Sequence, residues 1–498
     1  MTSRKILLPA LASALTLAAL ASCGDTQSGA SQQQPEDTHE SAVTEAETEV
    51  KQIDIIGGLG DLDFGGAVLN IDISVNSQEW LTSSVYQMGP AEETGDIIQD
   101  MVFRRNKEIE EALNVGVNWK ETDLNYDAVA SYIKKQVMAG DDIVDLYLND
   151  QFGFITCMVN GYFKNLEHTE TYQSYFDFSV DGWNDAYMKK LSLIDGRRYF
   201  LVGSYFMDTL RSAHVIYFNR NIMADLYEGA DELYNLVEAG QWTFAKYLEY
   251  TENTYSDLNG NGKVDTEDRF GTFFYDGWSV LFHSISDARL VSWENGYPTV
   301  DIDMERNVKA MELFDRIVSS DGDYPDNANG DDVIPVFLTG RLLMTGWRKI
   351  ADIEREEMRN MDGIGIIPYP KLDEQQENYQ TIIHDTTEIG AVPVTSTDEK
   401  TSIVSAYLQA QTQYTTEYIL PAYYETALKI KYSQDEQSAR MLDIIRRGIT
   451  DPFDYAYSSY LGGIPFLTGK NYASSVEKKL KTAEDKLQKL LDTVTALE

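Results

Sequence analysis

A regular alternation of strand-like and helix-like segments near the start of the folded part most constrains how this chain folds. Residues 67–73 and 115–121 have the hydrophobic pattern of strands, and residues 143–148 form a third, short apolar strand. Between them, residues 96–113 and 126–138 carry apolar side chains three and four positions apart, which is typical of helices packed on one face. This β-α-β-α-β order predicts a largely parallel sheet covered by helices, and therefore an α/β fold.

The rest of the chain alternates less regularly, and it contains no repeat of fixed period. A clear amphipathic helix closes the sequence, with apolar residues from Val476 to Val494 at three- and four-residue spacing. Strands are predicted at 198–202, 213–218, 363–367 and 389–394, helices at 223–239, 243–253 and 304–318, and a strand followed by a helix at 271–285.

The N-terminal region carries signals of export. Two basic residues precede an apolar stretch that is short for a membrane span, so residues 1–22 match a secretory signal peptide. Residues 20–23, Leu-Ala-Ser-Cys, resemble the lipobox of bacterial lipoproteins, in which the cysteine is acylated, for example with palmitate. The alternative is an ordinary signal followed by an incidental Cys23. Residues 23–52 are rich in Ser, Thr, Gln and Glu and lack aromatic residues, which predicts a disordered tether.

Charge and cysteine content limit the partners. The formal net charge of −40 argues against the basic surface that nucleic acids require, and against docking on anionic lipid headgroups. We therefore expect no nucleic-acid partner, and contact with the membrane only through the lipid on Cys23. Cys157 is then the one remaining thiol, and its apolar neighbours predict a small buried core residue without a disulfide or redox role.

Residues 257–268 have the spacing of a calcium-binding loop. Oxygen-bearing side chains stand at loop positions 1, 3, 5, 9 and 12, with Gly262 at the turn and the apolar Val264 at a packing position. The pattern resembles EF-hand and dockerin loops, although position 12 is Asp instead of the EF-hand Glu and a dockerin has two such loops. The alternative is an Asx-rich turn without metal. The expected ligands of a structural Ca²⁺ are Asp257, Asn259, Asn261, the carbonyl of Lys263, Asp265 through water, and Asp268.

Signatures of catalysis are mostly missing from the sequence. It has no His-Glu-x-x-His motif, no Gly-x-Ser-x-Gly elbow and no phosphate-binding P-loop, and its five His are scattered. A carboxylate pair for glycoside hydrolysis stays open, because 81 acidic residues offer many pairs and no feature of the sequence singles one out.

A series of short motifs occurs in a fixed order along residues 53–498. They are 141–147, 161–166, 195–199 with Gly203, 216–220, 241–243, 337–344 with Trp347, and 421–429. In this order they resemble motifs of the extracellular solute-binding proteins of family 1, the maltose-binding-protein-like carbohydrate receptors of ABC importers. Each motif is weak evidence alone, and their order carries the resemblance. Asp142-Ile143-Val144-Asp145 departs from the family pattern because it lacks the usual Pro.

The resemblance implies a two-lobed, periplasmic-binding-protein-like fold of type II, with a hinge between the lobes, ligand held between them and a helical C-terminal region. It places crossings between the lobes near 210–216, 382–388 and 428–433. The expected division is 53–212 for the N-lobe, 213–383 for the C-lobe with the calcium-loop insertion, 384–430 for the return to the N-lobe, and 431–498 for C-terminal helices on the C-lobe.

Sugar binding requires aromatic faces for pyranose rings and planar polar groups for hydroxyls. The candidate ligand residues follow predicted strands, lie at predicted crossings or come from the helical end, and Trp347 stands where the family places a stacking Trp. Core packing is the alternative for each aromatic residue. The candidates are Tyr147, Asn149, Asp150, Tyr205, Asp208, Arg211, Asp276, Trp278, Trp347, Arg348, Asp385, Glu388, Tyr455 and Tyr457.

Together these observations favour a non-catalytic, monomeric receptor, extracytoplasmic and lipid-anchored to the cell membrane, that captures a sugar or oligosaccharide and delivers it to an ABC permease. Two other classes stay open. A surface carbohydrate-active enzyme would release product from glycans in catalytic amounts. A calcium-dependent adhesion protein would bind a partner protein in calcium and lose it with chelator.

Overall fold

The computed structural model describes residues 59–75, 84–275, 277, 279–325, 333–384, 387–429 and 436–497. The signal peptide, Cys23 and the predicted tether lie outside these residues. Residues 52–498 make up one compact unit. Within the described ranges, no helix combines the length and the apolar character needed to cross a membrane.

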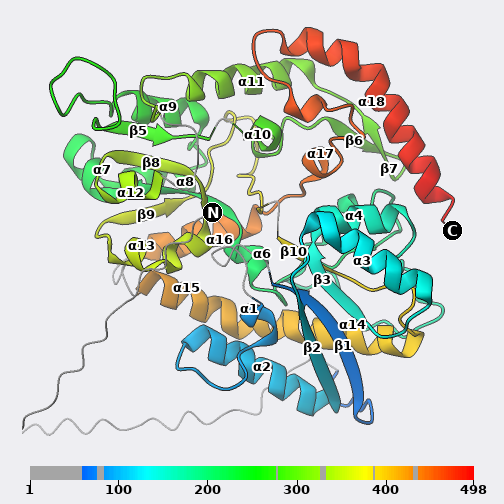
Figure 1. The fold of residues 1–498 in the computed structure, drawn as a ribbon. Helices are drawn as coiled ribbons and strands as arrows, with labels where there is room; N and C mark the ends of the chain where they lie inside the picture. The colour runs from blue at the N-terminus through cyan, green and yellow to red at the C-terminus, as the bar shows by residue number, and fades with distance from the viewer. Residues whose placement is uncertain are drawn as a thin grey trace, which may run out of the picture. The chain divides into compact units, whose positions relative to one another are not determined.

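The first sheet gathers strands from distant parts of the sequence in the order β10-β3-β1-β2 (Figure 1). β1 (Ala67–Ser74) lies parallel to both β2 (Val115–Thr122) and β3 (Leu146–Asp150), as the predicted β-α-β-α-β order requires. β10 (Glu388–Ala391) pairs antiparallel with β3, so that a late segment of the chain returns to this sheet.

The helices that connect these strands begin and end at the expected capping residues. α2 (Ile97–Leu113) begins after Asp96, whose carboxylate accepts the backbone N–H groups of the first turn. α3 (Tyr126–Ala139) follows Asn125, which caps in the same way, and ends at Gly140 in the left-handed conformation. α14 (Asp398–Tyr414) packs against α2 and β1 (Figure 1).

The second sheet has the order β5-β8-β4-β9. β8 (Leu342–Lys349) pairs parallel with β5 (Phe270–Phe273) and antiparallel with β4 (His214–Asn219), and β9 (Ile364–Ile367) pairs antiparallel with β4. The second sheet is therefore mixed, in contrast to the parallel centre of the first.

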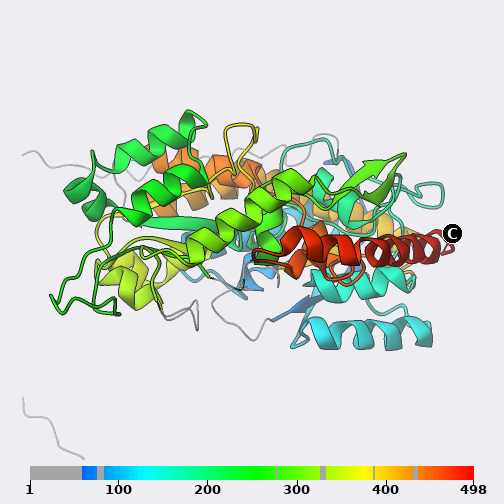
Figure 2. The same cartoon turned by 90° about the horizontal axis from the view of Figure 1, so that it is seen from above.

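Further helices and a hairpin surround the two sheets. α16 contacts β9 and α8. α18 contacts β7, α11 and α4, the last of which belongs to the layer around the first sheet. Figure 2 shows α11 and α18 side by side. These elements are α1 (Val85–Met88), α4 (Gln151–Val159), α5 (Asp185–Leu191), α6 (Asp208–Arg211), α7 (Arg220–Leu226), α8 (Ala230–Glu238), α9 (Phe244–Glu252), α10 (Ser279–Ile285), β6 (Val291–Glu294), β7 (Tyr297–Val300), α11 (Met304–Val318), α12 (Val333–Leu338), η3 (Ile350–Glu354), α13 (Glu356–Asn360), η4 (Thr415–Ile419), α15 (Leu420–Lys429), α16 (Glu436–Arg447), α17 (Phe453–Ala456), η5 (Ile464–Phe466) and α18 (Tyr472–Thr495).

Two predicted elements differ most from the structure, and β3 begins three residues later than the strand predicted at 143–148. The strand expected at 198–202 is reduced to a single bridge between Leu201 and Gly390, because the backbone N–H groups of Arg198 and Tyr199 donate to side-chain oxygens and not to a neighbouring strand. The helix expected at 223–239 is divided into α7 and α8 with Gly229 between them, whose φ of 113° is incompatible with a helix.

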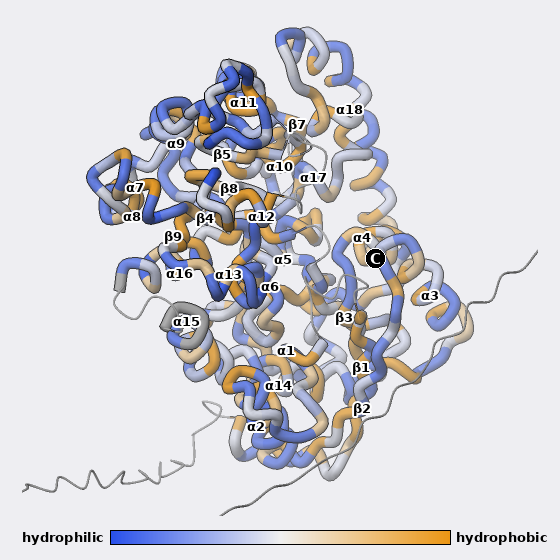
Figure 3. The backbone as a smooth tube through the Cα atoms, turned by 60° about the vertical axis from the view of Figure 1, so that its left-hand side comes forward, coloured by the Kyte–Doolittle hydropathy of each residue, from blue (hydrophilic) through white to orange (hydrophobic). Residues whose placement is uncertain are grey.

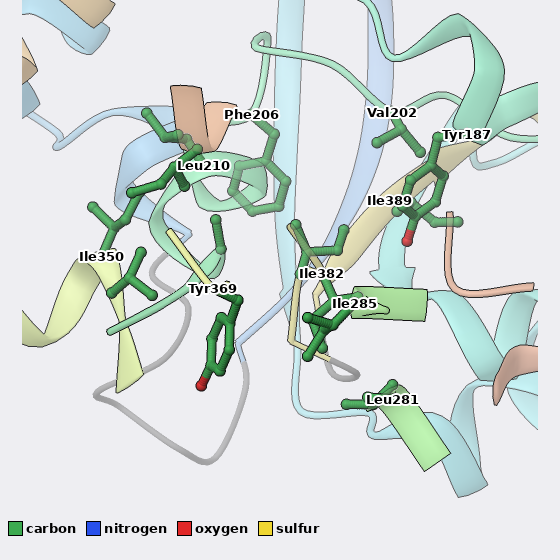
Figure 4. Packing of buried hydrophobic residues seen from close by; sticks show 14 of the residues in the cluster. Tyr187, Val202, Phe206, Leu210, Leu281, Ile285, Ile350, Tyr369, Ile382 and Ile389 are labelled. Atoms are coloured by element: carbon green, nitrogen blue, oxygen red, sulfur yellow. The ribbon is translucent and has the colours of Figure 1, made fainter. Parts of the chain in front are cut away.

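The core is a continuous cluster of buried hydrophobic residues that draws on both sheets. Phe206, Leu210, Ile382 and Ile389 belong to it although they come from segments far apart in the sequence (Figure 4). Along α18 hydrophilic and hydrophobic stretches alternate, as expected of an amphipathic helix (Figure 3). Cys157 is fully buried in this core, as predicted, and burial raises the pKa of its thiol to about 12.

A fully buried arginine holds several of these segments together. The guanidinium of Arg105 on α2 donates to the carbonyl oxygens of Tyr205 (2.9 Å) and Gln87 (2.8 Å) and to the Thr415 hydroxyl (2.8 Å). Burial lowers the pKa of Arg105 to about 10, so the group still carries its charge at neutral pH. These partners come from three separate stretches of chain, which makes Arg105 a structural cross-link.

We expect Arg105→Ala to lower the free energy of unfolding by about 3 kcal/mol or more, because it leaves buried acceptors unpaired and opens a cavity. The neighbouring Arg104→Ala is the matched control, since the Arg104 side chain is 55% exposed, and it should change the value by about 0.5 kcal/mol or less. Urea unfolding measures both, and equal effects would contradict the role given to Arg105.

Candidate functional site

Two extended segments that join the sheets run side by side. The His214 N–H donates to the Ile382 carbonyl and the His384 N–H to the Ser212 carbonyl, each at 2.9 Å. Ala213 and Ile383 form the antiparallel bridge between them. These segments lie where crossings were predicted, near 210–216 and 382–388. Their side chains therefore lie between the two sheets.

A further segment lies beside this pair. Thr381 donates its N–H to the Gly448 carbonyl and accepts the Thr450 N–H at its own carbonyl, each at 2.8 Å. The third crossing was predicted near 428–433, of which residues 430–433 lie outside the described residues. The domain boundaries given for the two lobes stay predictions.

Four aromatic rings gather at the end of β8 where the chain crosses. The Trp347 ring lies 5.0 Å from Tyr275, 5.1 Å from His214 and 6.0 Å from His384, measured between ring centroids. Trp347 and Tyr275 are each partly exposed. We call this group of four residues the aromatic site. Half-exposed rings of this kind provide the flat apolar surface on which a sugar ring stacks.

The backbone of Trp347 is held in an unusual conformation. Its φ is +57°, the left-handed region that bulky residues rarely adopt, and the adjacent pairing of β4 with β8 contains an irregularity. The Trp347 N–H donates to the hydroxyl of the buried Tyr369 at 2.7 Å, which stabilises the turn. Such strain is characteristic of functional positions, because the surrounding structure must offset its cost.

Sequence analysis predicted Trp347 but missed the other three members of the aromatic site. Tyr275 lies two residues after the end of β5, so its position near a strand end was the signal that could have found it. The two His are 170 residues apart in the sequence, and only the pairing of the crossing segments brings their rings within 5.4 Å. No pattern in the sequence marks that proximity.

The polar candidates of the first sheet lie at the carboxyl end of β3 and the start of β10. Asn149, Asp150 and Glu388 are all buried, and Asp150 pairs with Glu388 across the two strands. The Asp150 carboxylate accepts the N–H groups of Phe152 and Gly153 and thereby caps α4. The Asn149 side-chain oxygen accepts the N–H of Asp150 at 2.7 Å.

Glu388 is a buried acid with an unusual environment. Burial raises the pKa of its carboxyl well above the ordinary value, the nearby carboxyl groups of Asp208 and Asp150 raise it further, and the Ser74 hydroxyl partly opposes the shift. This shift favours the protonated form of the Glu388 carboxyl. A neutral carboxyl donates a hydrogen bond where a carboxylate only accepts.

Arg211 forms a polar link between segments of both sheets' layers. Its guanidinium donates two hydrogen bonds to the Glu354 carboxylate, at 2.9 and 2.7 Å, and also pairs with Asp208. The Tyr86 ring stacks on it at 3.8 Å, and the Tyr423 hydroxyl donates to Glu354 at 2.7 Å. Arg211 and Asp208 were both predicted to bind ligand. In this structure they form an ion pair with each other, and Arg211 also pairs with Glu354.

Most of the remaining candidate residues lie inside the core. Tyr147 is buried with its ring against Tyr132, the Tyr205 hydroxyl donates to Leu201 at 2.8 Å, and the Tyr457 hydroxyl donates to Leu191 at 2.5 Å. Arg348 is buried 3.8 Å from the Asp352 carboxylate. Only Tyr455 is partly exposed, with its ring edge against Phe152 at 4.9 Å.

Three further candidates lie outside the described residues: Asp276, Trp278 and Asp385. They flank Tyr275 and His384 in the sequence. Their contribution to the aromatic site stays a prediction.

The predicted calcium loop folds around its own carboxylates. Asp257 accepts the N–H groups of Gly260 (2.6 Å) and Gly262 (2.8 Å), and Asp268, fully buried, accepts those of Leu258 and Asp265. The Asn259 and Asn261 oxygens each accept a backbone N–H two residues on, at Asn261 and at Lys263. The side-chain oxygens of the loop therefore accept hydrogen bonds from the loop's own backbone, and the Asp265 carboxylate accepts the side-chain amides of Asn259 and Asn261.

Two observations limit the fit of the loop to a calcium site. Val264 was expected to pack, yet its side chain is 51% exposed. Within the described part of the chain, no group of three or more His, Cys, Asp or Glu side chains is arranged to hold a metal ion. The calcium assignment is therefore a proposal.

Comparison with known proteins identifies the architecture. No protein-family model matches the sequence, and no curated protein matches it. A solved cyclo/maltodextrin-binding protein in complex with maltotetraose aligns over 86% of this chain and 97% of its own, with a TM-score of 0.51 and 12% identity. The chain has the maltodextrin-binding protein fold. This confirms the predicted two-lobed α/β fold of the periplasmic-binding-protein type.

Two other solved structures align over similar lengths. An ABC substrate-binding protein from Listeria monocytogenes in complex with cycloalternan covers 86% of this chain and 99% of its own, at 14% identity and a TM-score of 0.48. A family 1 extracellular solute-binding protein from Bifidobacterium longum subsp. infantis covers 85% and 100%, at 12% identity and 0.49. The assignment of the maltodextrin-binding protein fold rests on the first alignment.

We expect Glu388→Gln to change the pH dependence of stability. An unfolded Glu ionises near its ordinary pKa of about 4.3, whereas the folded group stays protonated to higher pH. Between these two pKa values the folded state binds more protons, so the free energy of unfolding of the wild-type protein falls as pH rises. The variant lacks this loss and should gain stability relative to wild type from pH 4 to pH 8.

Urea unfolding at pH 4, 6 and 8 measures this difference. Glu305→Gln, at an exposed position of α11, is the control and should show a difference that does not grow with pH. A constant offset between Glu388→Gln and wild type at all three pH values would show that folding does not raise the pKa of the Glu388 carboxyl.

Proposed function

We propose that this chain is a non-catalytic solute receptor that binds a sugar or oligosaccharide between its two sheets. The observation that carries the proposal is Trp347, a partly exposed aromatic residue held in a strained backbone conformation where the chain crosses between the sheets. The structurally similar protein with the TM-score of 0.51 is described as bound to maltotetraose, which supports a saccharide ligand for the shared fold.

The aromatic site has the chemistry that saccharide binding needs. Trp347 and Tyr275 present apolar ring faces, while the imidazoles of His214 and His384 add polar groups to the same cluster. Burial lowers the pKa of His214 well below its usual value, and the charges of His384, Lys349 and Arg348 lower it further. His214 is therefore neutral near pH 7 and can both donate and accept hydrogen bonds.

The proposal also covers the delivery of the ligand to a transporter and the cellular location of the protein. A receptor of this type hands its ligand to ABC permease subunits, works as a monomer, and stays outside the cytoplasm near the membrane. The lipobox-like sequence supports acylation of Cys23, with residues 23–52 as a tether. Mass spectrometry of the native N-terminus tests this, and an unacylated residue 23 would remove the anchor but not the receptor.

We expect Trp347→Ala to weaken saccharide binding by about tenfold or more, because it removes the central ring of the aromatic site. Isothermal titration calorimetry with a panel of mono- and oligosaccharides that includes maltotetraose measures this. Trp119→Ala on β2 is the matched control, since Trp119 is also partly exposed but lies on the outer strand of the first sheet, and its affinity should match wild type.

Two results would reject the proposal. If no saccharide bound the wild-type protein, the carbohydrate ligand would be wrong while the fold stayed. If the protein released products from glycans in catalytic amounts, it would be an enzyme and not a receptor.

We also propose that residues 257–268 bind a structural Ca²⁺. Asp257, Asn259, Asn261, the Lys263 carbonyl, Asp265 and Asp268 would supply its oxygens. Arg341, next to β8, donates to the Thr266 carbonyl with its guanidinium, so an ordered loop would pin this insertion to the second sheet. The role is structural, because the loop lies on a different segment from every residue of the aromatic site.

Saturating Ca²⁺ should therefore stabilise the wild-type protein, by about 2.7 kcal/mol at a hundredfold excess over the dissociation constant. Asp257→Ala should abolish this gain, while Asp301→Ala, at another exposed Asp, should keep it. Thermal melts with Ca²⁺ and with chelator measure the effect. An Asp257→Ala protein that Ca²⁺ stabilises as strongly as wild type would refute the loop as the site.

A further inference from the structure

A cavity of about 240 Å³ lies beside the crossing segments and shares no residue with the aromatic site. Its apolar floor is formed by Phe206, Met207 and Leu210, all buried, and Figure 4 shows Phe206 and Leu210 around the turn of α6. Trp183, Leu420 at the start of α15 and Ile449 after α16 add to the apolar lining, and Asn184, Ser204 and Thr209 contribute polar groups to it. The cavity is therefore built by segments from four separate parts of the chain.

The size of the cavity limits its occupant. A volume of about 240 Å³ corresponds to about eight water molecules at the liquid volume of about 30 Å³ each. This is smaller than the usual range of pockets for drug-sized ligands. The occupant that fits is a small metabolite with on the order of ten non-hydrogen atoms and an apolar body.

The rim of the cavity presents opposite charges on two facing segments. Asp181 lies on one side and Arg446 and Arg447, at the end of α16, on the other. Asp181 and Arg446 form a two-point ion pair at 2.8 and 3.2 Å. Arg447 pairs with Asp443 at 2.9 Å, and its side chain is 72% exposed, so that it can turn toward a ligand. The Asp181 side chain is 68% exposed and is equally accessible.

We propose that this cavity binds an α-amino acid with an apolar side chain. The ligand carboxylate would bind the guanidinium groups of Arg447 and Arg446, and its ammonium group would bind the Asp181 carboxylate. The side chain of the ligand would lie on the floor formed by Phe206, Met207 and Leu210. A zwitterion matches both signs of the rim, whereas an acid or an amine alone matches only one and leaves the other charge without a new partner.

This proposal does not depend on saccharide binding at the aromatic site. The cavity lining contains none of the residues His214, Tyr275, Trp347 and His384. An amino acid bound here would contact both the segment leading into the first crossing and the end of α16, which packs on β9 of the second sheet.

Isothermal titration calorimetry of the full chain with L-phenylalanine tests the proposal. We expect saturable binding of L-phenylalanine, and binding at least about tenfold weaker for phenylacetate, which lacks the ammonium group, and for phenethylamine, which lacks the carboxylate. Asp181→Asn and Arg447→Gln should each weaken L-phenylalanine binding by about fivefold or more. Both side chains are well exposed, so these variants should fold, which thermal melts verify.

Two control variants define where the binding occurs. Arg104→Gln removes an exposed arginine of α2 that is paired with Glu93, and it should bind L-phenylalanine as wild type does. Trp347→Ala should also bind it unchanged, because it alters only the aromatic site. The proposal is overturned if 10 mM L-phenylalanine gives no binding, if either single-charge analogue binds as well, or if Asp181→Asn and Arg447→Gln bind with wild-type affinity.

Discussion

The structure depends on the pairing of the extended segments that join the two sheets. Ser212–His214 and Ile382–His384 exchange backbone hydrogen bonds, and Gly448–Thr450 pairs with Thr381 beside them. Because these few bonds connect the layers around each sheet, they set where the ends of β8 and β10 lie. They also bring His214 and His384 to Trp347. A few connecting residues of this kind can act as the hinge in proteins whose domains close on a ligand.

The buried acidic residues near these segments differ in whether a cation is paired with them. Asp208 forms an ion pair with Arg211, which also binds Glu354. Glu388 has no such cation among the causes of its shift: burial and the nearby carboxyl groups of Asp208 and Asp150 raise the pKa of its carboxyl well above the ordinary value. A raised pKa favours the neutral form, which reduces the buried negative charge near the crossing.

Periodicity in the sequence was sufficient to predict the parallel part of the first sheet, β1 to β3, because the spacing of apolar residues reports which face of each segment is buried. It did not predict that β10 pairs antiparallel with β3. The same reasoning failed at 198–202, where side chains of Asn165 and Ser192 take the backbone hydrogen bonds that a strand would use. The resemblance to solute-binding proteins predicted the crossings and Trp347. It could not separate partly exposed aromatic residues from core residues. Tyr147, Tyr205 and Tyr457 are buried, yet their residue type and their place in the sequence are those expected of ligand-binding residues.

Tertiary contacts also explain what the sequence did not reveal. Tyr275 and the two His of the aromatic site become neighbours only through the pairing of distant segments, and the cavity bordered by Asp181 and Arg446 joins residues 265 positions apart. Conversely, the proposed calcium loop is a local feature, so its motif is visible in consecutive residues, and its metal stays a prediction. Sequence reasoning is weakest where the fold assembles the site from distant segments.

We propose that the protein binds a saccharide between its two sheets and that the sheets move closer together when it binds. The most direct measurement is the distance between spin labels on cysteines introduced at Lys135 on α3 and Glu305 on α11, both exposed, with and without a saturating oligosaccharide such as maltotetraose or a tighter member of the panel. Cys157 is buried and its raised pKa keeps it unreactive, so it does not compete for label. The account predicts a single shorter distance in the presence of ligand. An unchanged distance distribution at saturation would contradict it.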